Sequence, residues 1–207
     1  MTAQQAAKEE MIAKLKEYYH DNKPQLKQVE EFDQAYSSED VIRWYVRPFI
    51  FRPITQALRT ENAGQIHAYR FLINDLRLMI LQEYEQIKGS VEHLTVYRGG
   101  QFSNDEFEQM KKNIGNTLTK NEFLSTTRTR EIALMFANSY DPTSDRKSVL
   151  FEITFGANSS AVFADISRRG DYPDESEILF DLGTTFEIQS IDLEEASNLW
   201  IIKLKAN

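Results

Sequence analysis

Cysteine is absent from this chain of 207 residues. Its absence excludes disulfide bonds, thiolate metal sites and a cysteine nucleophile. It also suits a reducing compartment such as the cytoplasm, without proving one. The first ten residues contain no basic segment followed by an apolar run, so they do not resemble a secretory signal peptide. The compartment is left open by these features.

Histidine and long apolar runs are scarce too. His20, His67 and His93 lie far apart in the sequence, and none has a second ligand at the spacing of a metal site. No uninterrupted apolar run approaches the roughly 20 residues that span a membrane. Hydrophobic residues make up 41% of the chain and aromatic residues 12%, which suits an ordinary globular core. We expect a soluble protein with no metal site and no membrane segment.

The net charge of −8 is unevenly distributed. Residues 1–90 contain 12 Lys and Arg against 13 Asp and Glu, whereas residues 91–207 contain 12 against 19. Proteins that bind nucleic acid usually carry a basic surface. The acidic second half therefore argues against nucleic acid as the main partner, and any phosphate group would have to be held locally.

Helical periodicity dominates the first ninety residues. Ser37 begins a capping box, and the helix that follows should bury an aromatic face that includes Trp44. Pro48 indicates a new or kinked helix after it. The clearest periodicity runs from Ile66 to Ile87. The expected helices cover residues 1–20, 25–36, 37–46, 49–59 and 66–87.

Short strand patterns replace the helices from Leu94 onward. The expected strands cover residues 94–97, 122–127, 149–155, 161–166, 175–181, 186–191 and 199–204, with two short helices at 104–113 and 130–138. Helices followed by strands predict an α+β architecture with mostly antiparallel sheets. We expect a helical region at 1–90 and a second region at 91–207, either as two domains or as one continuous domain.

An acidic turn runs into an apolar strand in the segment Asp171–Phe180. Side chains two apart in a strand share a face, so Glu175 and Glu177 should lie side by side while Ser176, Ile178 and Phe180 face the other way. Two carboxylates in one site require a nearby cation, a hydroxyl or a proton. Taken alone, this segment is explained more simply as a solvated acidic turn on the surface.

Two other segments carry groups that could act with these acids. Arg98, Gly99 and Gly100 end an apolar strand, where an arginine can bind phosphate oxygens and glycines allow close approach of a ligand. The run 123–127 contains three consecutive hydroxyls, and a hydroxyl that faces a carboxylate can orient it. Each segment alone also fits an ordinary turn or a half-buried strand.

In order along the chain, three motifs resemble those of the mono-ADP-ribosyltransferases of the R-S-E branch, which contains arginine-specific ecto-enzymes and actin-modifying bacterial toxins. They are Tyr97-Arg98-Gly99, Phe123-Leu124-Ser125-Thr126-Thr127 and Glu175-Ser176-Glu177. Further agreement lies at 133–137, 164–166 and 183–186, and at 54–59 in the helical half. Thr127 departs from the pattern, since many relatives have Ser there, and the secreted vertebrate enzymes carry disulfides that this chain lacks.

The resemblance implies a helical bundle packed against a mostly antiparallel two-sheet core, with NAD+ as co-substrate and no metal. Glu177 would stabilise the oxocarbenium-like ribose formed when nicotinamide leaves, and Ser125 would hold Glu177 in place. Arg98 would bind the diphosphate, and Gly99 would offer backbone groups to the nicotinamide amide. Thr126 would belong to the same NAD+-binding set.

The resemblance also implies an acceptor protein with an accessible arginine. Glu175 would bind the guanidinium and assist its loss of a proton, because a guanidinium is cationic and a poor nucleophile. Tyr172 would contact the acceptor or pack within its own turn. We expect a monomer that is cytoplasmic, or a secreted toxin-like protein that acts in a cytosol.

Three alternatives stay open at this point. The same fold could transfer ADP-ribose to water, as an NAD+ glycohydrolase, because water needs only the Glu177 side of the site. Two carboxylates about 7 Å apart on one strand face also fit an inverting glycosidase, although that leaves Arg98 and the hydroxyl motif unexplained. A non-catalytic interaction module would be expected to have lost the second Glu.

Overall fold

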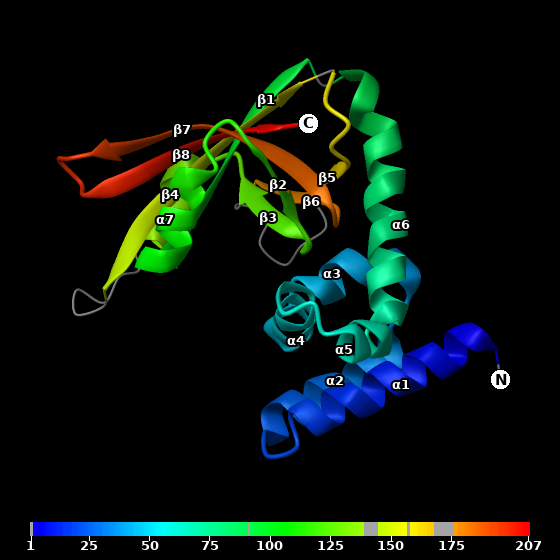
Figure 1. Cartoon of the computed structure of the whole chain (residues 1–207). Coiled ribbons are helices and arrows are strands. Elements are labelled where there is room, and N and C mark those ends of the chain that lie inside the picture. Colours follow the sequence, from blue (N-terminus) through cyan, green and yellow to red (C-terminus); the bar gives the residue numbers. More distant parts are fainter. Residues whose placement is uncertain (1, 91, 139–144, 157, 168–175) are drawn as a thin grey trace. The chain divides into compact units, whose positions relative to one another are not determined.

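The computed structural model describes residues 2–90, 92–138, 145–156, 158–167 and 176–207. It confirms an α+β fold that combines helices with a mixed β-sheet (Figure 1). The described residues divide into two compact units, a helical unit up to Gln82 and a second unit that begins at Glu83. The domain boundary near residue 90 stays a prediction, and so does the packing of a helical bundle against the sheet.

Several helices build the helical unit, and side chains cap the first turns of some of them. These helices are α1 (Ala3–Tyr18), α2 (Lys23–Ala35), η1 (Ser38–Asp40), α3 (Val41–Tyr45), α4 (Pro48–Arg59), α5 (Ala63–Ala68) and α6 (Arg70–Ile87), which continues into the second unit. Thr2, Asn22 and Asn62 accept hydrogen bonds from the first turns of α1, α2 and α5. The single helix expected over 66–87 is wrong, because the chain leaves helical geometry at Tyr69, where ψ is 2°.

Aromatic side chains form the centre of the helical unit, as the sequence predicted for the helix that contains Trp44. Trp44 is 5% exposed, and its ring lies 5.2 Å from Phe32 and 6.3 Å from Phe49. Both contacts are edge-on, which aromatic rings prefer. Trp44 is therefore a core residue and not a contact surface.

The second unit holds the sheet. Its elements are η2 (Lys88–Ser90), β1 (His93–Ser103), α7 (Asn104–Lys112), β2 (Thr117–Lys120), β3 (Leu124–Thr127), α8 (Arg130–Ala137), β4 (Arg146–Gly156), β5 (Phe163–Asp165), β6 (Glu177–Phe180), β7 (Thr184–Glu194) and β8 (Leu199–Ala206). The described strands lie in the order β2-β7-β8-β4-β1-β3-β6-β5 (Figure 1). β4 and β8 pair in parallel, and the other described pairs are antiparallel.

One hydrogen-bonded sheet joins all the described strands, so the expected division into two sheets is not confirmed. The join between β1 and β3 is narrow, with Tyr97 opposite Thr127 as its paired position. The edge strand β2 was not expected from the sequence. It offers Leu118 as its single apolar side chain, and pairing with β7 stabilises it more than its own pattern does.

Apolar side chains cover both faces of the sheet. On one face Phe155, Phe163, Phe180 and Phe186 contact one another within a larger cluster of buried residues. On the other face α8 packs through Ala133 and Ala137. In the described part of the chain, no helix is both long and apolar enough to cross a membrane.

Candidate active site

The three sequence motifs meet where β1, β3 and β6 lie side by side (Figure 1). β1 carries Arg98, β3 carries Ser125 and β6 begins with Glu177. In the antiparallel register of β3 and β6, Ser125 lies opposite Leu179, and Thr127 lies opposite Glu177. Ser125 and Glu177 are therefore diagonal neighbours on one face of the sheet, within reach of a side-chain contact.

Ser125 holds the Glu177 carboxylate directly. Its hydroxyl Oγ donates a hydrogen bond to Oε1 of Glu177 at 2.6 Å, across 52 residues of sequence. Hydrogen bonds to an ionised acceptor are short and strong. The hydroxyl thus fixes the orientation of a partly buried carboxylate at the beginning of its strand.

Arg98 is fixed to the same strand from the other side. Its Nη1 donates to the carbonyl oxygen of Ser125 at 2.7 Å. Arg98 lies opposite Phe151 in the pairing of β1 with β4, and Phe151 belongs to the large apolar cluster. Because facing residues share a side of the sheet, Arg98 points to that side, away from α8. Arg98 and Glu177 are both linked to Ser125, Arg98 through its carbonyl and Glu177 through its hydroxyl.

Gly99 faces α8 and lies against its backbone. A Cβ atom at this position would stand 1.8 Å from the carbonyl oxygen of Ala133 and 2.6 Å from the amide nitrogen of Ala137. Only glycine permits this close packing of helix on strand. Close packing against α8 therefore explains why a glycine stands at position 99. The contact of Gly99 with nicotinamide stays a prediction.

Thr126 points to the opposite face from Ser125. It is 3% exposed, and its hydroxyl donates to the carbonyl oxygen of Ile178 at 2.8 Å. This bond ties β3 to β6 from behind the site. The expected role of Thr126 in binding NAD+ is untested and stays a prediction, since the hydroxyl has a structural partner.

The start of β6 differs from expectation. We expected a strand from Glu175, but β6 begins at Glu177, and Ser176 has a φ of 46°, which lies in the left-handed region. The alternation of faces cannot be extended backward through such a residue. The expected placement of Ser176 on the face of Ile178 and Phe180 is therefore not confirmed. Glu175 and Tyr172 lie outside the described residues.

Sequence reasoning did not single out Arg128, which contacts the start of β6. Its amide nitrogen donates to the carbonyl oxygen of Ser176 at 3.1 Å, and its Nη2 lies 2.8 Å from Oδ2 of Asp165. Asp165 is the last residue of β5 and stands in the segment Ala164–Ile166 that agreed with the family pattern. No pattern in the sequence pairs these two residues across 37 positions.

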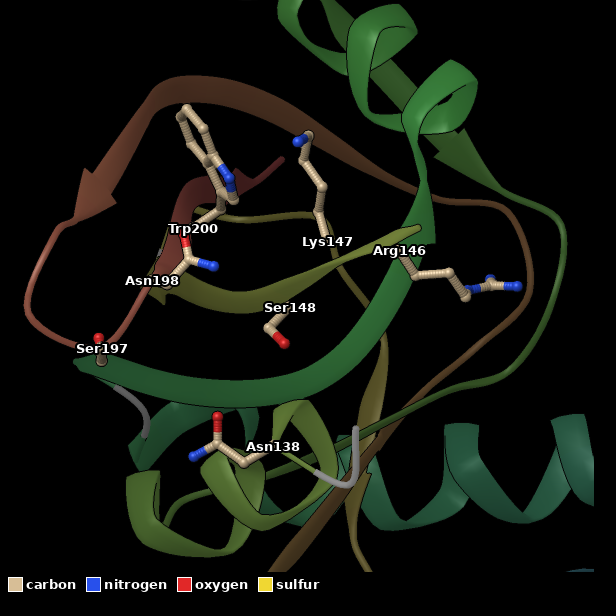
Figure 2. Close-up of a pocket in the computed structure, with 7 residues that line it drawn as sticks. All are labelled: Asn138, Arg146, Lys147, Ser148, Ser197, Asn198 and Trp200. Atoms are coloured by element: carbon tan, nitrogen blue, oxygen red, sulfur yellow. The ribbon is translucent and has the colours of Figure 1, made fainter. Parts of the chain in front are cut away.

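A pocket of about 240 Å³ lies elsewhere in the second unit (Figure 2). It is lined by Asn138, Arg146, Lys147, Ser148, Ser197, Asn198 and Trp200. Ser148 lies opposite Gln101, which alternation places on the same side of β1 as Gly99. Figure 2 shows Ser148 and Asn138 on one side of β4, and Lys147 and Trp200 on the other. Arg98, Ser125 and Glu177 are not among the residues that line it.

Charged groups that could hold a metal ion do not gather anywhere in the described residues. Near the pocket, the pKa of Glu106 is lowered because its carboxylate accepts a hydrogen bond from the Ser103 amide and another from the Ser103 hydroxyl. Arg146, 3.8 Å away, lowers this pKa further. This carboxylate caps α7 and is separate from the three motifs.

Comparison with known proteins agrees with the geometry. A family model described as ADP-ribosyltransferase exoenzyme matches residues 27–207, while no curated protein matches the sequence. Among solved structures, the ADP-ribosyltransferase HopU1 of Pseudomonas syringae pv. tomato DC3000 is 16% identical, with 100% of this chain and 98% of HopU1 covered and a TM-score of 0.62.

Two further structures show the same fold. The Vis toxin, an ADP-ribosyltransferase from Vibrio splendidus, is 21% identical over 82% of this chain and 72% of its own, with a TM-score of 0.54. Exoenzyme S from Pseudomonas aeruginosa, solved with human 14-3-3 protein beta and bound to carba-NAD, is 15% identical over 99% and 88%, with a TM-score of 0.60. At these identities the likeness establishes the fold of mono-ADP-ribosyltransferase toxins.

Proposed function

Because the chain belongs to the ADP-ribosyltransferase exoenzyme family, we propose that it transfers ADP-ribose from NAD+ to an arginine side chain of a protein and releases nicotinamide. The observation that carries the proposal is the hydrogen bond of 2.6 Å between Ser125 and Glu177, with Arg98 anchored on the Ser125 carbonyl at 2.7 Å. The order of these residues along the chain, which resembles that of the R-S-E motifs, supports the proposal.

The chemistry requires each of these groups. The bond between the ribose C1 and the nicotinamide nitrogen breaks, and its electron pair leaves with nicotinamide. The ribose becomes oxocarbenium-like, and the Glu177 carboxylate stabilises this positive charge. A guanidinium nitrogen of the acceptor then attacks the same carbon and loses one proton. Ser125 keeps Glu177 oriented, and Arg98 binds the diphosphate through its planar fork of donors.

NAD+ is the donor we assign. Exoenzyme S, which shares the fold, is bound to the NAD analogue carba-NAD. A carboxylate and an arginine that both bind Ser125 suit a ligand that carries a ribose and a diphosphate. The arginine acceptor rests on Glu175, whose carboxylate would bind a guanidinium and assist its loss of a proton. Tyr172 would contact the acceptor protein.

The proposal is tested with NAD+ labelled in its ADP-ribose part, with and without agmatine as an arginine mimic. We expect labelled agmatine from the unaltered protein. Glu177→Gln should lower NAD+ cleavage at least ~100-fold, the usual cost of removing a group that stabilises transition-state charge. Glu175→Gln should lose transfer to agmatine while keeping some hydrolysis. Glu187→Gln, which alters a carboxylate of β7, is the matched control and should keep full activity.

The second candidate is an NAD+ glycohydrolase. It is favoured by the fact that Arg98, Ser125 and Glu177, the groups needed for cleavage, form a connected set among the described residues. Free ADP-ribose without labelled agmatine would support hydrolysis or an acceptor other than arginine. Absence of NAD+ turnover and binding in the unaltered protein would reject both functions.

A further inference from the structure

β6 begins at its own functional residue, Glu177. The ends of strands open more readily than their centres. The residue before Glu177 is Ser176, whose φ of 46° is uncommon for any residue other than glycine. An unsupported chain would leave this conformation, and the carboxylate would move with it. The surrounding structure must therefore hold the first residues of β6.

Residues that follow the two neighbouring strands supply this support. The amide of Arg128, just after β3, donates to the Ser176 carbonyl at 3.1 Å. The amide of Ile166, just after β5, donates to the Glu177 carbonyl at 3.0 Å. The two carbonyl groups at the start of β6 are thus held from opposite sides, one by each neighbour.

We propose that the ion pair between Arg128 and Asp165 positions Glu177. The pair forms a bridge across the start of β6, because it joins the two segments whose amides hold the Ser176 and Glu177 carbonyls. The proposal rests on the function proposed above. Arg128 Nη2 lies 2.8 Å from Asp165 Oδ2. The other carboxylate oxygen, Oδ1, accepts from the amide and the hydroxyl of Ser167 at 3.2 and 2.6 Å. Arg128 and Asp165 are positioning residues that act through the backbone of Ser176 and Glu177.

The backbone of Arg128 is itself held in place. The hydroxyl of Thr127 accepts from the amide of Thr129 at 3.0 Å, a local turn that fixes the residue between them. Thr127 also lies opposite Glu177 in the sheet. A change at Arg128 is therefore transmitted to Glu177 through two short connections, the strand pairing and the bond to Ser176.

The exposure of the pair separates positioning from stability. The Arg128 side chain is 45% exposed and that of Asp165 is 33% exposed. Ion pairs at such sites contribute little to the free energy of unfolding. A displacement of about 1 Å in a catalytic group can nevertheless lower a rate ~100-fold. We therefore expect the pair to affect catalysis much more than folding.

The test compares Arg128→Gln and Asp165→Asn with Arg130→Gln as matched control. Arg130 lies two positions further along, is 35% exposed, and its Nη2 stands 3.8 Å from a carboxylate oxygen of Glu194. In both bridge variants we expect kcat for NAD+ cleavage to fall about 10-fold, with KM for NAD+ within about 3-fold of the unaltered protein. Their melting temperatures should stay within about 3 °C of the control.

Exchanging the two charges should restore the kcat that the single variants lose. The double variant Arg128→Asp with Asp165→Arg restores the pair in reverse and should regain at least about half of the lost kcat. If either single variant fails to fold, the proposal is tested with Arg128→Lys instead. It keeps the charge, so we expect a smaller loss of kcat than in Arg128→Gln, and equal losses would overturn the proposal.

Two other outcomes overturn it as well. A kcat in Arg128→Gln equal to that of Arg130→Gln would show that the bridge does not position Glu177. A rise in KM with unchanged kcat would make Arg128 a substrate-binding residue. In both cases the unaltered protein turns over NAD+, so the proposed function stands. Absence of turnover in the unaltered protein would instead overturn the function and this proposal together.

Discussion

Ser125 and Glu177 are joined by a hydrogen bond of 2.6 Å across two antiparallel strands. The next residue, Thr126, points the other way, and its hydroxyl binds the carbonyl of Ile178. Two adjacent hydroxyls thus have different tasks. The first orients the Glu177 carboxylate, and the second ties together the strands that carry both partners.

This division predicts opposite effects for two neighbouring substitutions. Ser125→Ala should lower kcat for NAD+ cleavage about 10- to 100-fold, because it removes a hydrogen bond to a charged group. Its free energy of unfolding should change little. Thr126→Val should lower the free energy of unfolding by about 1–3 kcal/mol, because the Ile178 carbonyl loses a buried donor. NAD+ turnover and urea unfolding of both variants are the measurements.

Ser125→Thr is the matched control, because it keeps the hydroxyl and should regain most of the activity that Ser125→Ala loses. The assignment of tasks would be wrong if Thr126→Val lost more kcat than Ser125→Ala. It would also be wrong if Ser125→Thr were as inactive as Ser125→Ala.

The close approach of Gly99 to α8 gives a second prediction. Gly99→Ala should lower the free energy of unfolding by about 2 kcal/mol or more, since its Cβ would stand 1.8 Å from a backbone oxygen that cannot rotate away. At the neighbouring Gly100, the nearest atom to a new Cβ is a ring carbon of Phe102 at 3.6 Å. Gly100→Ala should therefore change stability by less than about 1 kcal/mol. Equal unfolding curves for the two variants would contradict the packing seen here.

The sequence predicted those parts of the site that lie on strands with a recognisable strand pattern. The apolar runs located β3 and β6, and the pairing of Ser125 with Glu177 was implied by the family resemblance of the motifs. Short segments with one apolar side chain, such as β2, carry no such pattern. The interruption of the long helix at Tyr69 was likewise hidden beneath continuous helical periodicity.

The backbone at Ser176 could not be predicted for a different reason. Left-handed conformations are signalled by glycine or asparagine, and a serine gives no such signal. The conformation is held by tertiary contacts from Arg128, which is 48 positions away in the numbering and becomes a neighbour only after β3 and β6 pair. Sequence reasoning therefore found the candidate site residues and missed the residues that hold the backbone beside Glu177.

The cap of α7 predicts a dependence of stability on acid. The pKa of Glu106 is lowered in the folded protein, chiefly by the hydrogen bond from the Ser103 amide. Its contribution is therefore present above the unfolded pKa, about 4.3, and is lost as the pH falls through the lower folded value. Glu106→Gln should lower the free energy of unfolding by about 0.5–1 kcal/mol at pH 7. This difference should disappear near pH 2, and a difference that stayed constant from pH 7 to pH 2 would contradict the cap.

Tyr36 predicts the opposite dependence, at alkaline pH. Burial raises the pKa of Tyr36 well above its ordinary value, and the hydrogen bond of 2.7 Å to Asp75 raises it further. A raised pKa contributes stability that is present below about pH 10, the unfolded value, and is lost as the pH rises above it. Tyr36→Phe should lower the free energy of unfolding by about 1 kcal/mol at pH 8, and the gap to the unaltered protein should close by pH 11.

Asp75→Asn separates the two causes of this raised pKa. It removes the negative charge beside Tyr36 and leaves burial as the larger cause. We therefore expect Asp75→Asn to retain part of the alkaline loss of stability, whereas Tyr36→Phe retains none that comes from this residue. Urea unfolding at pH 8, 9, 10 and 11 measures both variants. A gap between Tyr36→Phe and the unaltered protein that stayed the same at every pH would show that Tyr36 ionises as easily in the folded chain as in the unfolded one.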